Sequence, residues 1–280
     1  MSAALLEVDQ VTKDYVRGGL LSRQRIRAVD GVSFRLEAGQ PEIFSIIGES
    51  GSGKSTLASM ILNLVKPSAG HLRFAGADLA SLRLEAERLS FMAKVQPIFQ
   101  NPFEAFNPLK QLDHYLFMTA RRFTQAKDDA AAFQCVDDAL VKVGLSLAEV
   151  RGRYPHELSG GQLQRIAVAR ALIPSPQLIV ADEPVSMVDA SLRMSIVNLF
   201  KKLRDELGIS IIYITHDLAT AYYISDRIII MQRGKVVEAG DARTVLSNPQ
   251  HDYSRQLKAA VLLPDTHTRP QSTQGENVHV

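Results

Sequence analysis

The chain has a single cysteine, Cys135, among its 280 residues. One thiol cannot form an internal disulfide, and it excludes a cysteine-rich zinc or iron–sulfur site. Cys135 lies in a helix-like stretch rich in alanine and valine, which favours a buried thiol over a nucleophile. We therefore expect a reduced, intracellular protein.

Long apolar runs and an excess of one charge are also missing. The longest apolar runs, 209–214 and 228–231, have the length of strands and fall well short of the ~18 residues that a membrane-spanning helix needs. The N-terminus lacks the basic start of a secretory signal, so no signal peptide is expected. Lys and Arg number 32 against 30 Asp and Glu, a formal charge of +2. Since non-specific nucleic-acid binding needs a clustered basic face, no nucleic-acid partner is expected.

The composition that remains is that of a globular protein, with 46% hydrophobic and 22% charged residues, which excludes wholesale disorder. Short apolar runs predict buried parallel strands, and the stretches between them have helical spacing. Strands that alternate with helices imply a mainly parallel sheet covered on both faces. The predicted strands are Ile43–Ile47, Leu178–Ala181, Ser210–Ile214 and Arg227–Met231; the clearest helices are Lys54–Val65 and Leu192–Leu207, the latter ended by Gly208.

Three further regions depart from this alternation. Residues 5–11 and 28–36 alternate apolar and polar side chains, which predicts strands, the first of them at a sheet edge. The basic, glycine-containing stretch 17–27 between them is expected to be an exposed loop. Residues 100–157 show helical patterns with few strand signals and are interpreted as a helical subdomain inserted in the α/β core. The polar residues 265–280 are expected to be disordered.

A phosphate-binding loop follows the first predicted parallel strand. Its sequence matches G-x-x-x-x-G-K-[ST] and opens a predicted helix, which is the context that this motif requires. Backbone N–H groups of such a loop face the phosphates of a nucleotide, while the lysine reaches the β- and γ-phosphates and the following hydroxyl binds Mg²⁺. The loop predicts nucleoside triphosphate binding and consists of Gly48, Glu49, Ser50, Gly51, Ser52, Gly53, Lys54, Ser55 and Thr56.

Two carboxylates, Asp182 and Glu183, come directly after the apolar strand 178–181. An aspartate at this position can hold Mg²⁺, commonly through water. The neighbouring glutamate can orient and deprotonate an attacking water molecule. Since two adjacent carboxylates at the end of a buried strand repel one another, a cation at this place is expected.

A second candidate anion site precedes the amphipathic stretch 162–172. Ser159, Gly160, Gly161 and Gln162 follow Leu158 at the start of a predicted helix, where backbone N–H groups attract negative charge. One chain then carries two half-sites for phosphate. These half-sites can face each other only if two chains pack head to tail.

With these motifs the chain resembles the ATP-binding subunits of ABC transporters over about residues 5–262. The resemblance implies an α/β phosphate-loop NTPase fold, with a mainly parallel sheet core, an antiparallel N-terminal β subdomain and an inserted α-helical subdomain. We place the ATPase domain at residues 1–262, its helical subdomain at about 101–157, and a disordered tail at 263–280.

The same resemblance implies roles for further residues. Tyr15 would stack on the adenine, and Gln100 would sense Mg²⁺ and couple the site to membrane subunits. Leu158–Gln162 is similar to the family's signature motif, and Asp189 ends a stretch similar to its D-loop. His216 resembles the switch histidine that contacts the γ-phosphate. The implied catalytic set is Glu183, His216, Gln100 and Lys54; the implied magnesium ligands are Ser55, Gln100 and Asp182.

Within the family, the chain is most similar to the oligopeptide, dipeptide and nickel importers. Three segments carry this similarity: 18–21, the Gln-Asn-Pro stretch after Gln100, and His251–Leu257. It implies two integral-membrane permeases, a second ATPase or a second copy of this chain, and an extracytoplasmic solute-binding protein. It also implies a peripheral position on the cytoplasmic face of the bacterial inner membrane. Phe103 and Phe106, which follow Gln100, are expected to form a docking surface.

Several functions remain open from the sequence. The cargo could be peptides, oligosaccharides or nickel, with 186–193 weakly similar to the oligosaccharide branch. A soluble phosphate-loop kinase would have no need of 158–162 or His216. A non-transport accessory ATPase, such as a phosphonate-lyase-associated subunit, remains the serious alternative, with soluble enzyme partners in place of permeases.

Replacement of Lys54 by alanine tests the phosphate loop. We expect Lys54→Ala to abolish nucleotide affinity, because the ammonium group that meets the β- and γ-phosphates is lost. Equilibrium binding of a fluorescent ATP analogue measures the effect, and undiminished binding would rule out this loop as the phosphate site.

Overall fold

The computed structural model describes residues 3–262, apart from 18–23, 104, 125 and 127. The expected tail 263–280 and the centre of the expected basic loop lie outside the described residues. None of the helices in the described part of the chain is long and apolar enough to cross a membrane.

The centre of the protein is a six-stranded sheet with the order β10-β9-β3-β8-β7-β6. The five strands from β9 to β6 are parallel, and β10 closes the edge antiparallel to β9. The bounds are β3 Ile43–Ile47, β6 Val95–Ile98, β7 Leu178–Asp182, β8 Ser210–Thr215, β9 Arg227–Gln232 and β10 Lys235–Asp241. All four parallel strands predicted from apolar runs are confirmed, and β3 has the predicted ends.

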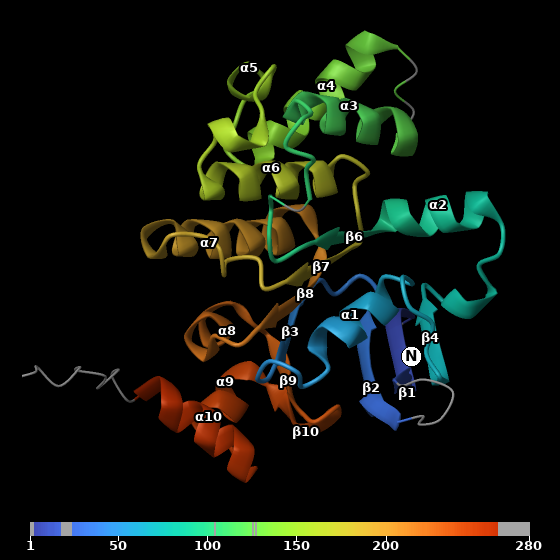
Figure 1. Ribbon diagram of the computed structural model, residues 1–280, viewed down its shortest axis with the longest axis vertical. Coiled ribbons are helices and arrows are strands. Elements are labelled where there is room, and N and C mark those ends of the chain that lie inside the picture. The colour runs from blue at the N-terminus through green and yellow to red at the C-terminus, as the bar shows by residue number, and fades with distance from the viewer. Residues whose placement is uncertain (1–2, 18–23, 104, 125, 127, 263–280) are drawn as a thin grey trace, which may run out of the picture.

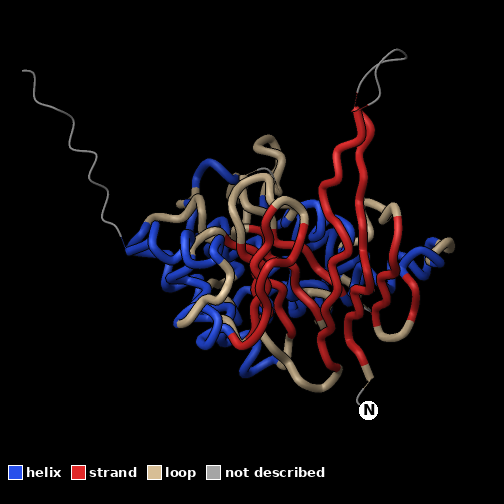
Figure 2. Tube along the Cα trace, turned by 90° about the horizontal axis from the view of Figure 1, so that it is seen from below, coloured by secondary structure: helices blue, strands red, loops and turns tan. Residues whose placement is uncertain are grey.

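A smaller antiparallel sheet precedes it, with the order β2-β1-β4-β5. Its strands are β1 Ala4–Arg17, β2 Gln24–Glu37, β4 Ala69–Phe74 and β5 Ala77–Asp78. In Figure 2 the paired strands β1 and β2 project beyond the rest of the molecule.

The helices cover both faces of the six-stranded sheet (Figure 1). Helices α3, α4, α6 and α7 share one hydrophobic core with one face, while α1 and the antiparallel sheet share another core with the opposite face. Helices α8, α9 and α10 surround a third core beside β9. Their bounds are α1 Lys54–Ile61, α2 Glu85–Lys94, α3 Leu112–Phe123, α4 Asp129–Lys142, α5 Leu147–Val150, α6 Gly160–Leu172, α7 Ala190–Leu207, α8 Leu218–Ile224, α9 Ala242–Ser247 and α10 Asp252–Leu262.

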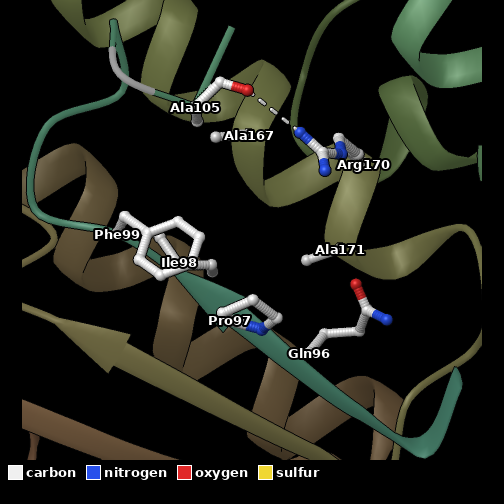
Figure 3. Close-up of a pocket in the computed structure, with 8 residues that line it drawn as sticks. All are labelled: Gln96, Pro97, Ile98, Phe99, Ala105, Ala167, Arg170 and Ala171. Atoms are coloured by element: carbon white, nitrogen blue, oxygen red, sulfur yellow. Dashed lines mark hydrogen bonds between the residues drawn. The ribbon is translucent and has the colours of Figure 1, made fainter. Parts of the chain in front are cut away.

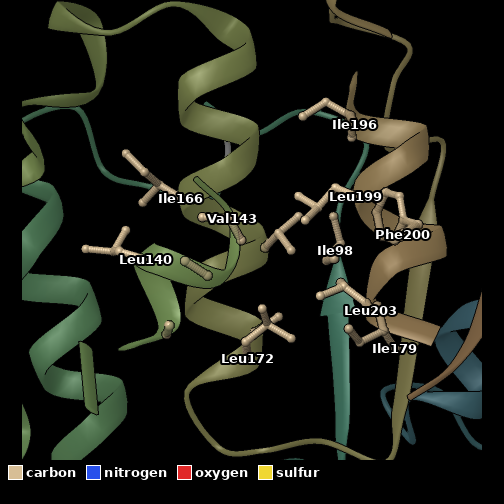
Figure 4. Close-up of a cluster of buried hydrophobic side chains, with 14 of the residues drawn as sticks. Ile98, Leu140, Val143, Ile166, Leu172, Ile179, Ile196, Leu199, Phe200 and Leu203 are labelled. Atoms are coloured by element: carbon tan, nitrogen blue, oxygen red, sulfur yellow. The ribbon is translucent and has the colours of Figure 1, made fainter. Parts of the chain in front are cut away.

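Strand β8 shows how the sheet separates the two main cores. Ile211 and Tyr213 point into the core shared with α6 and α7, whereas Ile212 and Ile214 point into the core shared with α1. Successive side chains of a strand face opposite sides, so an unbroken apolar run is what a strand buried on both faces needs. Figure 4 shows the first of these cores, where Phe200 and Leu203 of α7 meet Ile98 and Ile179 of the sheet.

Several details differ from the sequence-based expectations. β1 is not an edge strand, because it pairs with β2 on one side and with β4 on the other. The expected loop 17–27 is wrong at both ends, since Arg17 belongs to β1 and residues 24–27 belong to β2. Periodicity did not reveal this because polar side chains are tolerated in a hairpin that projects into solvent. The helix that starts at Lys54 ends at Ile61 and not at Val65; Asn63, with φ +54°, leaves the helical conformation.

The core beneath α7 yields a stability prediction. Phe200 is fully buried and its ring packs edge-on against Tyr213 at 5.7 Å between centroids. Phe200→Ala should lower the free energy of unfolding by about 3–5 kcal/mol, because it leaves a cavity. Urea denaturation measures the change. The control is Phe133→Ala, whose side chain is exposed on α4, with an expected change within about 0.5 kcal/mol. Equal losses in both variants would contradict the prediction.

Candidate nucleotide site

The phosphate loop lies between the carboxyl end of β3 and the first turn of α1. Two glycines allow the chain to turn in a crowded place. A Cβ atom on Gly48 would lie 2.3 Å from the carbonyl oxygen of Met231, and one on Gly53 would lie 2.3 Å from that of Ala28. Gly53 also has φ +105°, which side chains rarely allow. Larger residues at either position would therefore displace the loop.

Lys54 is held inside this loop. Its side chain is buried, and Nζ donates hydrogen bonds to the carbonyl oxygens of Gly48 at 2.7 Å and Glu49 at 2.8 Å. Burial lowers the pKa of the ammonium group, while the charges of Glu183 and Asp182 act in the opposite direction. The ammonium group of Lys54 is thus fixed at the loop, near the negative charges of Asp182 and Glu183.

Asp182 ends β7 beside the loop and shares a side-chain hydrogen bond with Ser55. Burial raises the pKa of the Asp182 carboxyl, and the adjacent Glu183 raises it further, whereas Ser55 and Lys54 lower it. A hydroxyl and a carboxylate side by side are oxygen donors of the kind that Mg²⁺ prefers. The structure therefore brings together two of the three predicted magnesium ligands.

Glu183 connects three segments that are distant in sequence. Its Oε1 lies 2.9 Å from Nδ1 of His216, and its Oε2 accepts a hydrogen bond of 3.1 Å from Nε2 of Gln100. The backbone of Glu183 has φ +45°, and its N–H donates to the carbonyl of Ile214 on β8 at 2.9 Å. Three of the four predicted catalytic residues thus meet at one carboxylate, and Lys54 interacts electrostatically with it.

The turn 159–162 opens α6 and forms reciprocal cap contacts. The Gln162 N–H donates to Ser159 Oγ at 3.3 Å, and the Ser159 N–H donates to Gln162 Oε1 at 3.1 Å. This capping box leaves the positive end of the helix at the surface. Helix α6 belongs to the core on the sheet face opposite α1. The structure therefore separates this turn from the phosphate loop of the same chain.

The stretch that ends at Asp189 packs directly under this turn. A Cβ atom on Gly160 would lie 3.3 Å from the Met187 carbonyl oxygen, and one on Gly161 would lie 3.0 Å from a methyl group of Leu192. Asp189 precedes α7, and its carbonyl accepts from the N–H of Leu192 at 2.9 Å. A side chain at 160 would press against backbone, whereas one at 161 would meet the end of the flexible Leu192 side chain.

Tyr15 lies on β1 opposite Ile26 of β2. Tyr15 is 41% exposed, and Nζ of Lys13 lies 5.3 Å from its ring centroid. Strand β2 continues to Ala28, whose carbonyl approaches Gly53 of the phosphate loop. The exposed side chain of Tyr15 is therefore carried by the strand pair that borders the loop, and its contact with adenine stays a prediction.

The remaining loop residues show one contact that sequence reasoning did not find. The N–H of Glu49 donates to the hydroxyl of Tyr253, near the C-terminus, at 3.0 Å. The only sequence signal for this segment is the family similarity of residues 251–257. Glu49, Ser50 and Ser55 are exposed, while Ser52 is buried with an unpaired Oγ. A buried hydroxyl without a partner in the described part of the loop is consistent with a phosphate-binding cradle.

Of the two phenylalanines predicted to form a docking surface after Gln100, only one is exposed. Phe103 is exposed, but Phe106 is buried, with its ring against Tyr115 at 5.3 Å and under the guanidinium of Arg170. The expectation of a docking role for Phe106 is wrong, since its side chain is part of the core. A sequence pattern cannot separate a core aromatic from an exposed one in an irregular segment.

Taken together, a buried lysine in a glycine-rich loop and a carboxylate bound to glutamine and histidine define a phosphate-loop ATPase. The chain matches the family model for ABC transporters over residues 29–186. It is 40% identical to the oligopeptide transport ATP-binding protein AppF of Bacillus subtilis, over 92% of this chain and 78% of the relative. It is 42% identical to OppF of Escherichia coli, over 86% and 71%. The chain therefore belongs to the ABC transporter family.

The fold agrees with this assignment. A solved dimeric ATP-binding cassette, MJ0796 in a post-hydrolysis state with ADP and phosphate, has a TM-score of 0.73 and 29% identity. The alignment covers 85% of this chain and 99% of that cassette. The predicted fold, with its antiparallel N-terminal sheet and mostly parallel central sheet, is confirmed.

Glu183→Gln separates hydrolysis from binding. The amide cannot accept a proton from water, so we expect the hydrolysis rate to fall by about 10² to 10⁴-fold while ATP still binds. Dimers should accumulate with bound ATP. Steady-state phosphate release and size-exclusion chromatography measure the two effects, and turnover at the unmodified rate would refute the role of Glu183.

Proposed function

We propose that this protein is the ATP-hydrolysing subunit of a peptide importer, which acts through partner permeases. The observation that carries the assignment of cargo class is the identity of 40% and 42% to two oligopeptide transport proteins over most of the chain. The hydrolytic chemistry is supported separately by the contacts of Gln100 and His216 with Glu183.

Two chains, identical or related, are needed for a complete site. The phosphate loop and the turn 159–162 belong to opposite faces of the same sheet. A head-to-tail pair would place the phosphate loop of one chain opposite the turn 159–162 of the other, with ATP buried between them. The dimeric state of the solved cassette supports this arrangement. ATP binding would then close the pair, and hydrolysis would reopen it.

Within each site the chain's residues have distinct tasks. Lys54 neutralises charge on the β- and γ-phosphates, and Glu183 orients the attacking water and accepts its proton. His216 and Gln100 hold the two oxygens of that carboxylate, which fixes its direction. Ser55 and Asp182, with Gln100, would hold Mg²⁺, which supplies charge stabilisation to the phosphates. Catalysis is then mostly positioning and electrostatic stabilisation.

A groove beside Gln100 is the proposed contact for a permease. It lies between β6 and α6, and Figure 3 shows Pro97 and Phe99 on the strand side and Arg170 and Ala171 on the helix side. Phe99 is 47% exposed, and Nη1 of Arg170 donates to the Ala105 carbonyl at 3.2 Å. Phe99 adjoins Gln100, which donates a hydrogen bond to Glu183. A protein bound in this groove would therefore be coupled to the position of the Glu183 carboxylate. The chain would thus lie peripherally on the cytoplasmic face of the bacterial inner membrane.

Peptides are favoured over the other candidates by the relatives. AppF and OppF are named for oligopeptide transport, and a dipeptide transport protein of Haemophilus influenzae is 39% identical over 88% of this chain. These names give no support to oligosaccharide cargo. They also favour transport over the accessory role with soluble enzyme partners. An extracytoplasmic solute-binding protein would deliver the peptide to the permeases.

Purification of the tagged chain from its native cells in mild detergent tests the proposal. Two polytopic membrane proteins and an ATPase partner should be identified by mass spectrometry, and the associated binding protein should bind peptides. A soluble enzyme complex without permeases would overturn the transport function and leave the ATPase activity standing.

The groove gives a sharper prediction for the same complex. Phe99→Glu should lower the ratio of captured permease to ATPase subunit by tenfold or more, since loss of one aromatic anchor costs about 2 kcal/mol. Phe133→Glu, with a similarly exposed ring on α4, serves as the control. An equal yield of permease from both variants would place the docking surface elsewhere.

A further inference from the structure

The mechanism described above makes no use of the C-terminal segment 250–257, yet this segment reaches the phosphate loop. Tyr253, in the first turn of α10, is 4% exposed. Its hydroxyl oxygen accepts the hydrogen bond from the N–H of Glu49 at 3.0 Å. These two residues are 204 positions apart in the chain. The contact is therefore a product of tertiary folding and not of local structure.

The geometry of the peptide bond gives this contact its meaning. The Glu49 N–H and the Gly48 carbonyl belong to the same planar peptide unit, and they point to opposite sides of it. Tyr253 holds the N–H, while Lys54 Nζ donates to the carbonyl at 2.7 Å. A rotation of this plane that breaks one hydrogen bond also misdirects the other. Tyr253 and Lys54 are thus linked through one rigid group.

Tyr253 is itself well anchored. Its ring belongs to the core around α8 and α9 that also contains Ile47, the residue directly before the phosphate loop. The carboxylate of Glu238 on β10 accepts from the N–H of Gln250 at 2.8 Å and from that of His251 at 3.2 Å. The turn into α10 is therefore tied to the sheet edge. The hydroxyl is thus held at a defined place by contacts within the protein itself.

We propose that Tyr253 is a positioning residue for the phosphate loop, which orients the Gly48–Glu49 peptide and through it the ammonium group of Lys54. The bound phosphates provide their own contacts to the loop. Tyr253 therefore acts chiefly before binding, by holding the loop in a receptive conformation. Such preorganisation raises the affinity for nucleotide, because the loop does not have to be ordered when the nucleotide binds. The C-terminal segment thereby sets the affinity of the chain for nucleotide.

Tyr253→Phe removes the acceptor and keeps the ring. For the full-length chain we expect the Kd for ATP and for ADP to rise by about fivefold, the equivalent of one net hydrogen bond. The KM for ATP should rise by the same factor, while kcat changes by less than a factor of about two, since bound phosphate holds the loop during turnover. Fluorescent nucleotide binding and phosphate release measure these quantities.

Tyr213→Phe is the matched control. Tyr213 is fully buried on β8, and its hydroxyl has no hydrogen-bond partner among the described residues. We expect this variant to bind and hydrolyse ATP as the unmodified chain does. A purely structural role of the Tyr253 hydroxyl would lower the melting temperature of the nucleotide-free protein without any change in KM. Unchanged KM and Kd in Tyr253→Phe, or a fall in kcat with KM constant, would overturn the proposal.

A local readout in Tyr253→Phe and a second variant test the same proposal. The amide hydrogen of Glu49 should exchange faster in Tyr253→Phe, whereas that of Ser52, which donates within the loop to the Glu49 carbonyl at 3.2 Å, should change less. Glu238→Ala, which frees the turn into α10, should raise KM in the same direction. An unaltered KM in that variant would also count against the proposal. Failure of the unmodified chain to bind ATP would instead refute the phosphate-loop assignment itself.

Discussion

The contacts of the Glu183 carboxylate with Gln100 and His216 are the interactions on which the rest of the site depends. One oxygen contacts His216, which follows β8, and the other accepts from Gln100, which follows β6. Because β6, β7 and β8 are adjacent and parallel, their carboxyl ends bring these three residues to one edge of the sheet. The left-handed backbone at Glu183 costs about 1–2 kcal/mol, and its N–H bond to Ile214 supports it. Backbone strain of this kind is found at functional sites, where the surrounding structure holds a side chain in a fixed direction.

The two cores on either side of the sheet keep the two proposed phosphate half-sites of one chain apart. The phosphate loop begins α1 on one face, and the turn 159–162 begins α6 on the other. Each half lies at the end of a helix that packs in a hydrophobic core. The central sheet thus prevents the two halves from meeting within one chain and leaves them available to a second chain. The groove near Phe99, the proposed permease contact, lies on the α6 side of the sheet.

The C-terminal helix adds a third support to the phosphate loop. β3 enters the loop, α1 leaves it, and α10 contacts it from the side through Tyr253. A loop of glycines and serines has many conformations, and its order must come from its surroundings. Close approach of the Met231 and Ala28 carbonyls limits its path from two further directions. The path of the phosphate loop is therefore determined by segments that no single motif contains.

The sequence alone was sufficient for the parallel strands, the phosphate loop and the carboxylate pair 182–183. Each depends on local chemistry, namely apolar runs or glycine and lysine at fixed spacing. It was insufficient where contacts join distant segments. The interior position of β1, the burial of Phe106 and the hydrogen bond from Glu49 to Tyr253 were decided only by tertiary structure. The physical reason is that spacing along a chain determines which face a residue occupies, whereas packing determines what that face meets.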